Sequence, residues 1–430
     1  MVELTPALPR QSGRRVAVLS KKPLATYRYD RWLSHADAEV VLFAEDTPAA
    51  RAFVKSAQHS YPTVPRLFAE WKRNRAVDEA LCAEHDRRPF DRIVALSECD
   101  VVRAAELRAH LGVPGQSLES ATAFRDKSVM KSLARRAGLR VPDHRPVESV
   151  SDLMDFADSH PGGVVVKPVD GSGAVDITVL HSRSEIETWM HTRALTSDDP
   201  TDYLVEEWVE APMLSVDGLM RSGKVAAVMV GSYTTTCLRS LVDLEPHGIL
   251  LLDPDDPRVA AARAYLTRLL RALPAAAETM SFHCELFDHP RYGPMLCEIA
   301  CRTGGGNVNS MARASLGIDL EQASCLGQAG CAVPVARALP DPRRRYGDLV
   351  LPRSPRQLPD GLECDLPGVV RFTARHDDRA LDRPQRAAKV SDYVADALLT
   401  ADDHAGVRRV YDSVIAWLDE HLPPNSGKGS

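Results

Sequence analysis

The residues that could do chemistry together are concentrated at positions 281–310, in the stretch SFHCELFDHPRYGPMLCEIACRTGGGNVNS. Apolar and polar residues alternate on both sides of the turn HPRYGP, which predicts two antiparallel strands. Because strand side chains alternate between faces, His283 and Glu285 should share one face of the first strand. By the same rule, Glu298 and Arg302 should share one face of the second. If the two faces coincide, two carboxylates meet a guanidinium, an arrangement that suits Mg²⁺ bound together with phosphates.

The triple glycine after Arg302 leaves backbone N–H groups uncovered, as an anion site requires. An amphipathic hairpin with a solvated charged face would show the same pattern, and the hairpin alone favours neither interpretation. Cys297 and Cys301 alternate onto the face opposite Glu298, which favours core packing for these two thiols.

Length and composition limit the class of protein. At about 150 residues per domain, 430 residues indicate two or three domains, and 44% apolar content is enough for their cores. A formal net charge of -6 gives no basic footprint for nucleic acid. The nine cysteines form no CxxC pair, which argues against a zinc ribbon or a disulfide scaffold. No apolar run approaches the roughly 20 residues needed to span a bilayer, and the N-terminus lacks a signal-type apolar region. We therefore expect a cytoplasmic protein without a membrane partner.

Strand and helix patterns alternate in the first part of the chain. The runs RRVAVLS, AEVVLFAE and DRIVALSE are of strand type, and residues 73–85 and 99–111 carry helical spacing. This pattern predicts a small parallel sheet covered by helices. A G-x-G-x-x-G turn is missing after the first strand, which argues against a dinucleotide site. The SEC turn at 97–99 could place polar groups at the carboxyl end of its strand, or Asp100 could cap the next helix.

A second unit begins near Gly115. Residues 118–137 read as a helical stretch, which Gly138 and Pro142 end. The stretch GGVVVKPVDGSGAVDITVL then predicts a buried strand, a glycine-containing loop and another strand. Lys167 closes the VVV run, where an unpaired ammonium is costly to desolvate and requires an anion. The loop DGSGA can fold its N–H groups over phosphates, although on its own the loop favours a plain hairpin turn.

Taken in order, these pieces resemble the ATP-grasp superfamily of carboxylate-amine ligases, and within it the branch of L-amino acid ligases and dipeptide synthetases. The resemblance covers residues 16–330. It rests on RDKSVMK at 125–131, VVVKPVDGSGAVDI at 164–177, LVEEWV at 204–209, FHCEL at 282–286 and CEIACRTGGG at 297–306. The order and spacing of these five landmarks carry more weight than any one of them.

The resemblance implies roles at matching positions. Lys127 and Lys167 would contact the nucleotide phosphates, and Glu285 and Glu298 would hold Mg²⁺. Arg302 would steady the transferred phosphoryl group and the acyl phosphate. The remaining implied contacts are a loop over the phosphates at Gly171, Ser172, Gly173 and Ala174, an adenine hinge at Glu206, Glu207, Trp208 and Val209, and a floor of the carboxylate site at Gly304, Gly305 and Gly306.

Three positions depart from the family pattern. Met213 stands where many members carry a glutamate for the ribose hydroxyls. Ala300 replaces the asparagine that often completes the metal site, which leaves more of the coordination to phosphate and water. Ala174 and Asp176 replace the more common serine and glycine of the phosphate loop.

The implied reaction is ATP-dependent formation of an amide or peptide bond through an acyl phosphate, with release of ADP and phosphate. The implied cofactors are ATP and Mg²⁺, as two ions with Mn²⁺ as a substitute, and the implied substrates are an amino acid or similar carboxylate and an amine. The alternatives are an ATP-grasp enzyme of another acceptor class, such as a carboxylase or phosphoryl-transfer enzyme, and a regulatory nucleotide-binding protein. His283 is a candidate base for the amine. Arg239 and His247, in the segment 234–256, are candidates for substrate contact, with solvated loop charges as the alternative.

The expected architecture is a multidomain α/β and α+β protein. A Rossmann-like, pre-ATP-grasp α/β domain (1–115) precedes a small (116–212) and a large (213–335) ATP-grasp α+β lobe. A small C-terminal α+β unit (336–422) and a disordered tail (423–430) follow, and PRSPRQLPDG at 352–361 reads as a connector or hairpin loop. A homodimer is the default oligomeric expectation.

Overall fold

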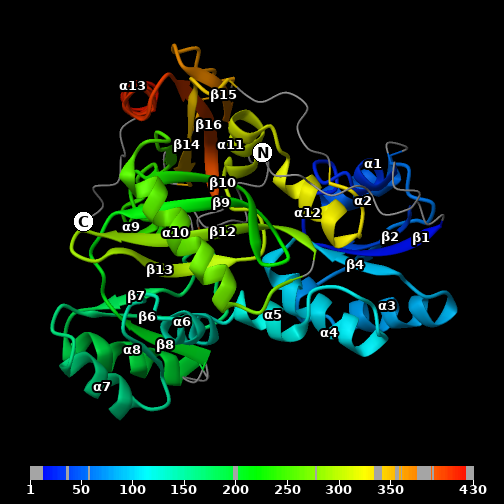
Figure 1. Ribbon diagram of the computed structural model, residues 1–430, viewed down its shortest axis with the longest axis horizontal. Coiled ribbons are helices and arrows are strands. Elements are labelled where there is room, and N and C mark those ends of the chain that lie inside the picture. The colour runs from blue at the N-terminus through cyan, green and yellow to red at the C-terminus, as the bar shows by residue number, and fades with distance from the viewer. Residues whose placement is uncertain are drawn as a thin grey trace.

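A computed structural model describes residues 13–34, 38–56, 59–196, 202–276, 278–333, 341–353, 358–359, 361–374, 389 and 392–422. Its strands form three separate sheets (Figure 1). The tail at 423–430 lies outside the described residues, as do residues 354–357 and 360 of the proline-rich segment. Within the described residues, no helix is long and apolar enough to cross a membrane.

The first sheet is parallel, with strand order β3-β2-β1-β4. Its strands are β1 (Arg14–Ser20), β2 (Ala38–Glu45), β3 (Arg66–Phe68) and β4 (Arg92–Ala95). The helices around it are α1 (Tyr29–Ser34), α2 (Pro48–Lys55), α3 (Ala76–Arg87) and α4 (Val101–Leu111), with the short 3-10 turns η1 (Trp71–Arg73) and η2 (Glu98–Asp100). Separate apolar clusters lie on the two faces of the sheet. The predicted parallel sheet is confirmed, with the three-residue strand β3 added to it.

The helical stretch predicted for residues 118–137 is two helices, α5 (Leu118–Ala123) and α6 (Lys127–Arg136). The break occurs at Asp126, whose carboxylate accepts hydrogen bonds from the N–H groups of Ser128 and Val129 and so caps α6. This cap matters for the site because it starts α6 at Lys127.

The second sheet is antiparallel, with strand order β5-β8-β6-β7. It contains β5 (His144–Pro146), β6 (Val164–Pro168), β7 (Thr178–Leu180) and β8 (Tyr203–Glu207), and α7 (Val150–Asp158) and α8 (Arg183–Thr196) pack on it. Lys167 is therefore on a strand whose neighbour, β8, carries the predicted adenine hinge.

The third sheet has eight strands in the order β13-β12-β9-β10-β11-β14-β16-β15. Its strands are β9 (Met213–Arg221), β10 (Lys224–Tyr233), β11 (Ile249–Leu251), β12 (Thr279–His289), β13 (Gly293–Ala300), β14 (Arg345–Pro352), β15 (Val369–Ala374) and β16 (Tyr393–Ala401). Its helices are α9 (Cys237–Asp243), α10 (Pro257–Ala272), α11 (Val308–Leu316), α12 (Leu320–Gln328) and α13 (His404–His421). Strand β14 pairs with β11, so the strands after residue 336 extend the same sheet as the hairpin β12-β13.

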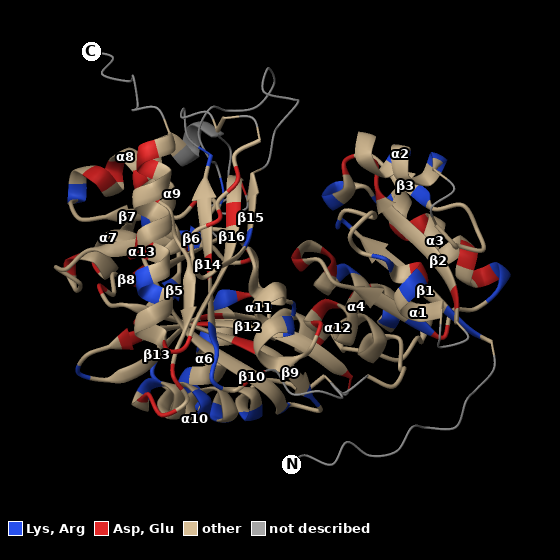
Figure 2. Cartoon of the chain, turned by 90° about the horizontal axis from the view of Figure 1, so that it is seen from above, with Lys and Arg blue, Asp and Glu red and all other residues tan. Residues whose placement is uncertain are grey.

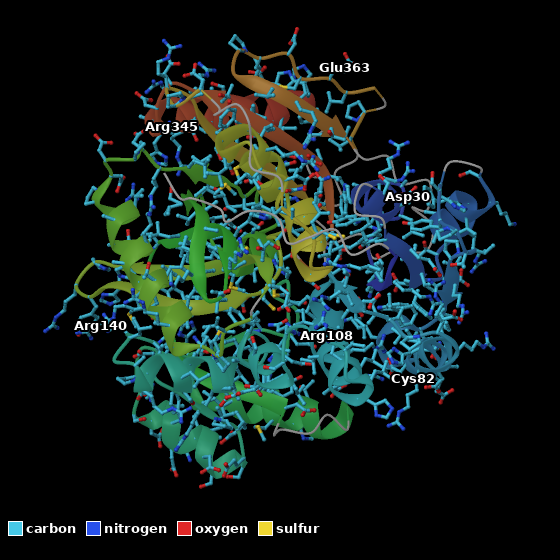
Figure 3. All side chains as sticks on the ribbon, turned by 45° about the vertical axis from the view of Figure 1, so that its right-hand side comes forward. Asp30, Cys82, Arg108, Arg140, Arg345 and Glu363 are labelled. Carbon is cyan, nitrogen blue, oxygen red and sulfur yellow. The ribbon has the colours of Figure 1, made fainter. Side chains whose placement is uncertain are left out.

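The parallel sheet docks on the third sheet through α12, which lies between them in Figures 1 and 2. The Gln328 side chain of α12 accepts a hydrogen bond from the Ala95 N–H at 2.9 Å and donates one to its carbonyl at 3.1 Å. Arg108, labelled in Figure 3 on α4, donates to the Ile93 carbonyl on the same strand at 2.6 Å. These contacts hold β4, and the turn that follows it, against the large sheet.

Candidate active site

The hairpin β12-β13 brings together the two faces that the alternation predicts for its strands. Glu285 lies directly opposite Glu298, and His283 lies opposite Ala300. A bulge at Leu286 lies just beyond the glutamate pair, and the turn occupies residues 290–292. The two carboxylates therefore face each other across neighbouring strands, on a sheet whose next strand is β9.

Lys127 joins the hairpin to the glycine-containing loop. Its ammonium lies 3.2 Å from the Glu298 carboxylate and donates a hydrogen bond to the Gly171 carbonyl at 2.8 Å. Burial opposes ionisation of Glu298, but the charges of Lys127, Lys167 and Arg302 lower its pKa to about 2. The carboxylate therefore stays charged at every pH at which an enzyme works.

Lys167 belongs to a buried cluster of three charges. Its ammonium lies 2.9 Å from one oxygen of Glu206, and Lys131 of α6 lies 3.1 Å from the other. Burial opposes the charge on Lys167, but Glu206 raises its pKa well above the usual value. Lys131 also donates a hydrogen bond to the Leu296 carbonyl of β13 at 3.0 Å. The anion that Lys167 requires is thus supplied by the protein, and the cluster ties the hinge strand β8 to α6 and the hairpin.

Arg302 lies just after β13, and its partner comes from the parallel sheet. Its guanidinium pairs with Glu98, which follows β4, and also donates to the Thr303 carbonyl at 3.0 Å. Glu98 also pairs with Arg125, whose guanidinium reaches the Asp170 carbonyl at the start of the loop. Burial disfavours the charged form of Glu98, but the positive charges of Arg302 and Arg125 lower the pKa of this carboxyl. A chain of contacts therefore runs from Arg302 to the loop.

His283 is held between two carboxylates. Its Nδ1 lies 2.8 Å from Asp217 of β9, and its Nε2 lies 3.6 Å from Glu285. Burial disfavours the imidazolium, but Asp217 raises the pKa of His283 to about 10. A histidine that is charged at neutral pH cannot accept a proton from the amine, so the geometry favours orientation of Glu285 over the base role expected from the sequence.

The loop and hinge residues lie around these lysines. In the loop, Gly173 and Ala174 have φ values of +67° and +58°, and Ser172 and Gly173 are exposed. In the hinge, the Glu207 N–H donates to the Asp143 carbonyl at 2.9 Å, and the Trp208 N–H donates to Gly163 at 3.0 Å. Val209 is half-buried, and Met213 is buried in β9. Glu206 cannot offer its carboxylate to adenine, because both oxygens face lysines.

The glycine floor lies over buried acidic groups. A side chain at Gly304 would lie 2.8 Å from His283 Nδ1 and 2.9 Å from Asp217 Oδ1, whereas Gly305 faces open space. Gly306 adopts φ +58° beside Asp348, a conformation that favours glycine. Only glycine therefore fits at position 304 unless the His283–Asp217 pair shifts.

Arg239 and His247 make their direct contacts with other partners, although the charge of Glu285 acts on His247. The Arg239 guanidinium pairs with Asp243 on its own short helix at 3.3 Å and is 73% exposed. His247 is buried and hydrogen-bonds Ser240 at 2.9 Å, and burial lowers its pKa to about 4. Neither side chain is brought to the hairpin carboxylates by the contacts described here.

Glu285 and Glu298 fit a hard cation together with a polyphosphate. Carboxylate oxygens are preferred by Mg²⁺, which keeps several waters and phosphate oxygens in its shell. Within the described part of the chain, no group of three or more His, Cys, Asp or Glu side chains is arranged to hold a metal by itself. The pair therefore suits a metal that arrives with a nucleotide.

Solved structures share this architecture over nearly the whole chain. An L-amino acid ligase from Bacillus licheniformis superposes with a TM-score of 0.68, at 17% identity, over 96% of this chain and 98% of that one. A carboxyaminoimidazole ribonucleotide synthase from Aspergillus clavatus, complexed with ATP, superposes with a TM-score of 0.67 at 16% identity, over 95% of this chain and 99% of that one. The chain has the ATP-grasp fold. The resemblance predicted from the five landmarks is thereby confirmed at the level of fold.

Sequence comparison points to the same branch. An L-arginine-specific L-amino acid ligase from Bacillus subtilis is 25% identical over 241 residues, which are 55% of this chain and 57% of that ligase. The chain thus matches little more than half the length of this curated relative. No protein-family model matches the chain.

Sequence reasoning gave no individual role to four residues that organise this site: Lys131, Glu98, Arg125 and Asp217. Lys131 and Arg125 stand inside the landmark RDKSVMK, and Lys131 follows Lys127 by one helical turn, so spacing alone could have indicated it. Asp217 is a lone carboxylate in the apolar run MLSVDGLM, which is a signal for a buried partner. Glu98 lies in the SEC turn, but its pairing with Arg302 spans 204 positions and no local pattern predicts it.

Proposed function

We propose that this protein is an ATP-dependent, ADP-forming ligase that joins the carboxylate of one amino acid to the amine of another. The observation that carries the proposal is the gathering of Lys127, Lys167 and Arg302 around the facing pair Glu285 and Glu298. The similarity to L-amino acid ligases in sequence and in fold supports amino acids as substrates.

The first step is phosphoryl transfer. A carboxylate oxygen of the first amino acid attacks the γ-phosphorus of ATP, the bond to the bridging oxygen breaks, and ADP leaves. Catalysis of such a transfer consists mainly of positioning and neutralising spread negative charge. Lys127 and Lys167 supply positive charge to the phosphates, and Arg302 supplies it at the transferred group.

The metal site is formed by Glu285 and Glu298. Bound there, Mg²⁺ would neutralise phosphate charge and align the reacting oxygens. The proposal includes two Mg²⁺ ions, for which Mn²⁺ can substitute. His283, charged and fixed by Asp217, orients the Glu285 carboxylate, which also accepts a hydrogen bond from the Tyr233 hydroxyl at 2.7 Å.

The second step makes the amide. The neutral amine attacks the carbonyl carbon of the acyl phosphate, the carbon–oxygen bond to phosphate breaks, and phosphate leaves. The amine loses a proton in this step, and the departing phosphate takes it up and leaves as hydrogen phosphate. Lys127 holds the Gly171 carbonyl, and Arg125 holds that of Asp170, so the loop at 171–174 is tied down over the reacting groups, where it keeps water from the acyl phosphate.

The test measures release of ADP and phosphate with Mg-ATP against L-amino acids, singly and in pairs, with mass spectrometry of each product. We expect ADP and phosphate in equal amounts and a product one water lighter than the two substrates combined. The Glu298→Ala variant should lose turnover, whereas Glu420→Ala, an exposed position on α13, should not. ADP release without a condensed product would favour carboxylation or transfer of the phosphoryl group to a final acceptor.

A further inference from the structure

Lys22 stands at the carboxyl end of β1, the edge at which open parallel sheets bind ligands. It is half-buried, and its ammonium lies 5.2 Å from the centre of the Tyr27 ring, a cation–π contact. The preceding lysine differs, because Lys21 forms an ion pair with Glu45 at 3.5 Å.

Lys22 shares its surroundings with the catalytic groups. Burial lowers the pKa of its ammonium, and the charges of Glu321, Arg302 and Glu98 act on it as well. Geometry places it there too, because β1 pairs in parallel with β4 and the Lys21 N–H donates a hydrogen bond to the Ser97 hydroxyl at 3.3 Å. Ser97 precedes Glu98, the partner of Arg302, so Lys22 lies beside the turn that carries that partner. Lys22 comes from the parallel sheet, whereas Lys127 comes from α6, which packs against β13, and Lys167 comes from β6 of the four-stranded antiparallel sheet.

The other site cations already have carboxylate partners. Lys127 pairs with Glu298, Lys131 and Lys167 pair with Glu206, and Arg125 and Arg302 pair with Glu98. Among the residues that the structure describes, no carboxylate lies within ion-pair distance of Lys22. The nearby Glu321 is engaged elsewhere, because its two oxygens accept hydrogen bonds from the Tyr27 hydroxyl and the Asn309 amide. A half-buried ammonium without a carboxylate partner is stabilised by an external anion.

We propose that Lys22 binds the α-carboxylate of the amino acid that supplies the amine. This inference rests on the proposed ligase function. The amine substrate keeps its carboxylate as a charge throughout the reaction, and the product carries the same group. The proposed function assigns Lys127, Lys167 and Arg302 to the phosphates and to the reacting carboxylate, so the carboxylate that does not react requires another cation.

The test separates the two halves of the reaction in the full-length chain. Hydroxylamine carries no carboxylate and converts an acyl phosphate into a hydroxamate, so it reports acyl-phosphate formation alone. The second half is measured with an accepted acceptor L-amino acid and with its primary amide. The variants are Lys22→Met and, as the matched control, Lys21→Met.

For Lys22→Met we expect hydroxamate formation within about twofold of the wild-type rate. We expect kcat/KM for the free-acid acceptor to fall about tenfold to a hundredfold, the effect of losing one hydrogen bond to a charged group. The amide acceptor should react at a nearly unchanged rate, and Lys21→Met should behave as the wild-type enzyme does.

Three results would overturn the inference. Equal losses with the acid and the amide acceptors would show that Lys22 does not recognise the carboxylate. A matching fall in hydroxamate formation would place Lys22 in the first half-reaction or in the fold. An unchanged free-acid rate would remove Lys22 from binding. Absence of hydroxamate with the wild-type protein on every L-amino acid would instead contradict the ligase function itself, and this inference with it.

Discussion

The buried charge cluster around Glu206 allows a quantitative test of how the small lobe is held together. Glu206 is 2% exposed and pairs with Lys167 at 2.9 Å and Lys131 at 3.1 Å. Glutamine keeps the shape of the side chain but removes the charge, so Glu206→Gln leaves two ammonium groups buried together. Breaking a buried ion pair by removing one partner typically costs about 3–5 kcal/mol.

For Glu206→Gln we expect a loss of stability of about 3 kcal/mol, the low end of the range for a broken buried ion pair. Burial already lowers the pKa of Lys131, so this lysine can release its proton and limit the repulsion once Glu206 is neutral. The matched control is the neighbouring Glu207→Gln. That side chain accepts the Asp143 N–H at 2.9 Å, and glutamine can still accept this bond, so its stability should stay within about 0.5 kcal/mol of the wild type.

Hydrogen exchange read by mass spectrometry is the assay, because a chain with three sheets need not unfold in one step. Peptides that cover β6 and β8 should exchange faster in Glu206→Gln by the factor that about 3 kcal/mol implies, on the order of a hundredfold. Peptides of the parallel sheet, β1 to β4, should be unaffected. If β6 and β8 were as well protected from exchange in Glu206→Gln as in Glu207→Gln, the carboxylate of Glu206 would not be the charge that holds the two lysines.

Three further predictions concern other parts of the chain. Arg302→Ala should still bind ATP in calorimetry but lose ligation by about a hundredfold or more, and unchanged turnover would remove this arginine from the mechanism. Gly304→Ala should destabilise the protein by about 1–3 kcal/mol, because a Cβ there would lie 2.8 Å from His283 Nδ1, whereas Gly305→Ala should leave the melting temperature nearly unchanged. His247 has a folded pKa of about 4 against 6.5 unfolded, so stability should fall by up to about 3 kcal/mol as the pH drops from 6.5 to 4. Urea titrations at each pH measure this loss, and His247→Asn should not show it. If the free energy of unfolding of His247→Asn fell with pH as steeply as that of the wild type, the result would contradict a buried neutral imidazole.

The elements of the hairpin and of the parallel sheet were predictable because their signals are local. Alternation gave the face of Glu285 on one strand and of Glu298 on the other, and the β-branched runs marked β1, β2 and β4. The pairing of the two glutamates comes from the structure. The break between α5 and α6 escaped because a single capping residue, Asp126, outweighs the helical spacing around it.

The partners of the site residues were not predictable in the same way. Lys167 was expected to have the nucleotide phosphates as its anion, and the structure pairs it with Glu206, a residue of the predicted hinge. Arg302 was expected to steady the transferred phosphoryl group, and the structure adds a pairing with Glu98, which follows β4 of the first sheet. Such pairs depend on how sheets far apart in sequence dock, and composition and periodicity carry no information about docking. The predicted domain boundaries stay predictions, although one sheet runs across residue 336.

The most direct test of the central claim follows oxygen. An amino acid labelled with ¹⁸O in its carboxylate is supplied with Mg-ATP and an amine, and the released nucleotide and phosphate are weighed by mass spectrometry. If the carboxylate attacks the γ-phosphorus and the acyl phosphate then breaks at its carbon–oxygen bond, inorganic phosphate gains one ¹⁸O atom and ADP gains none. Label in AMP, or unlabelled phosphate beside a condensed product, would contradict the acyl-phosphate mechanism.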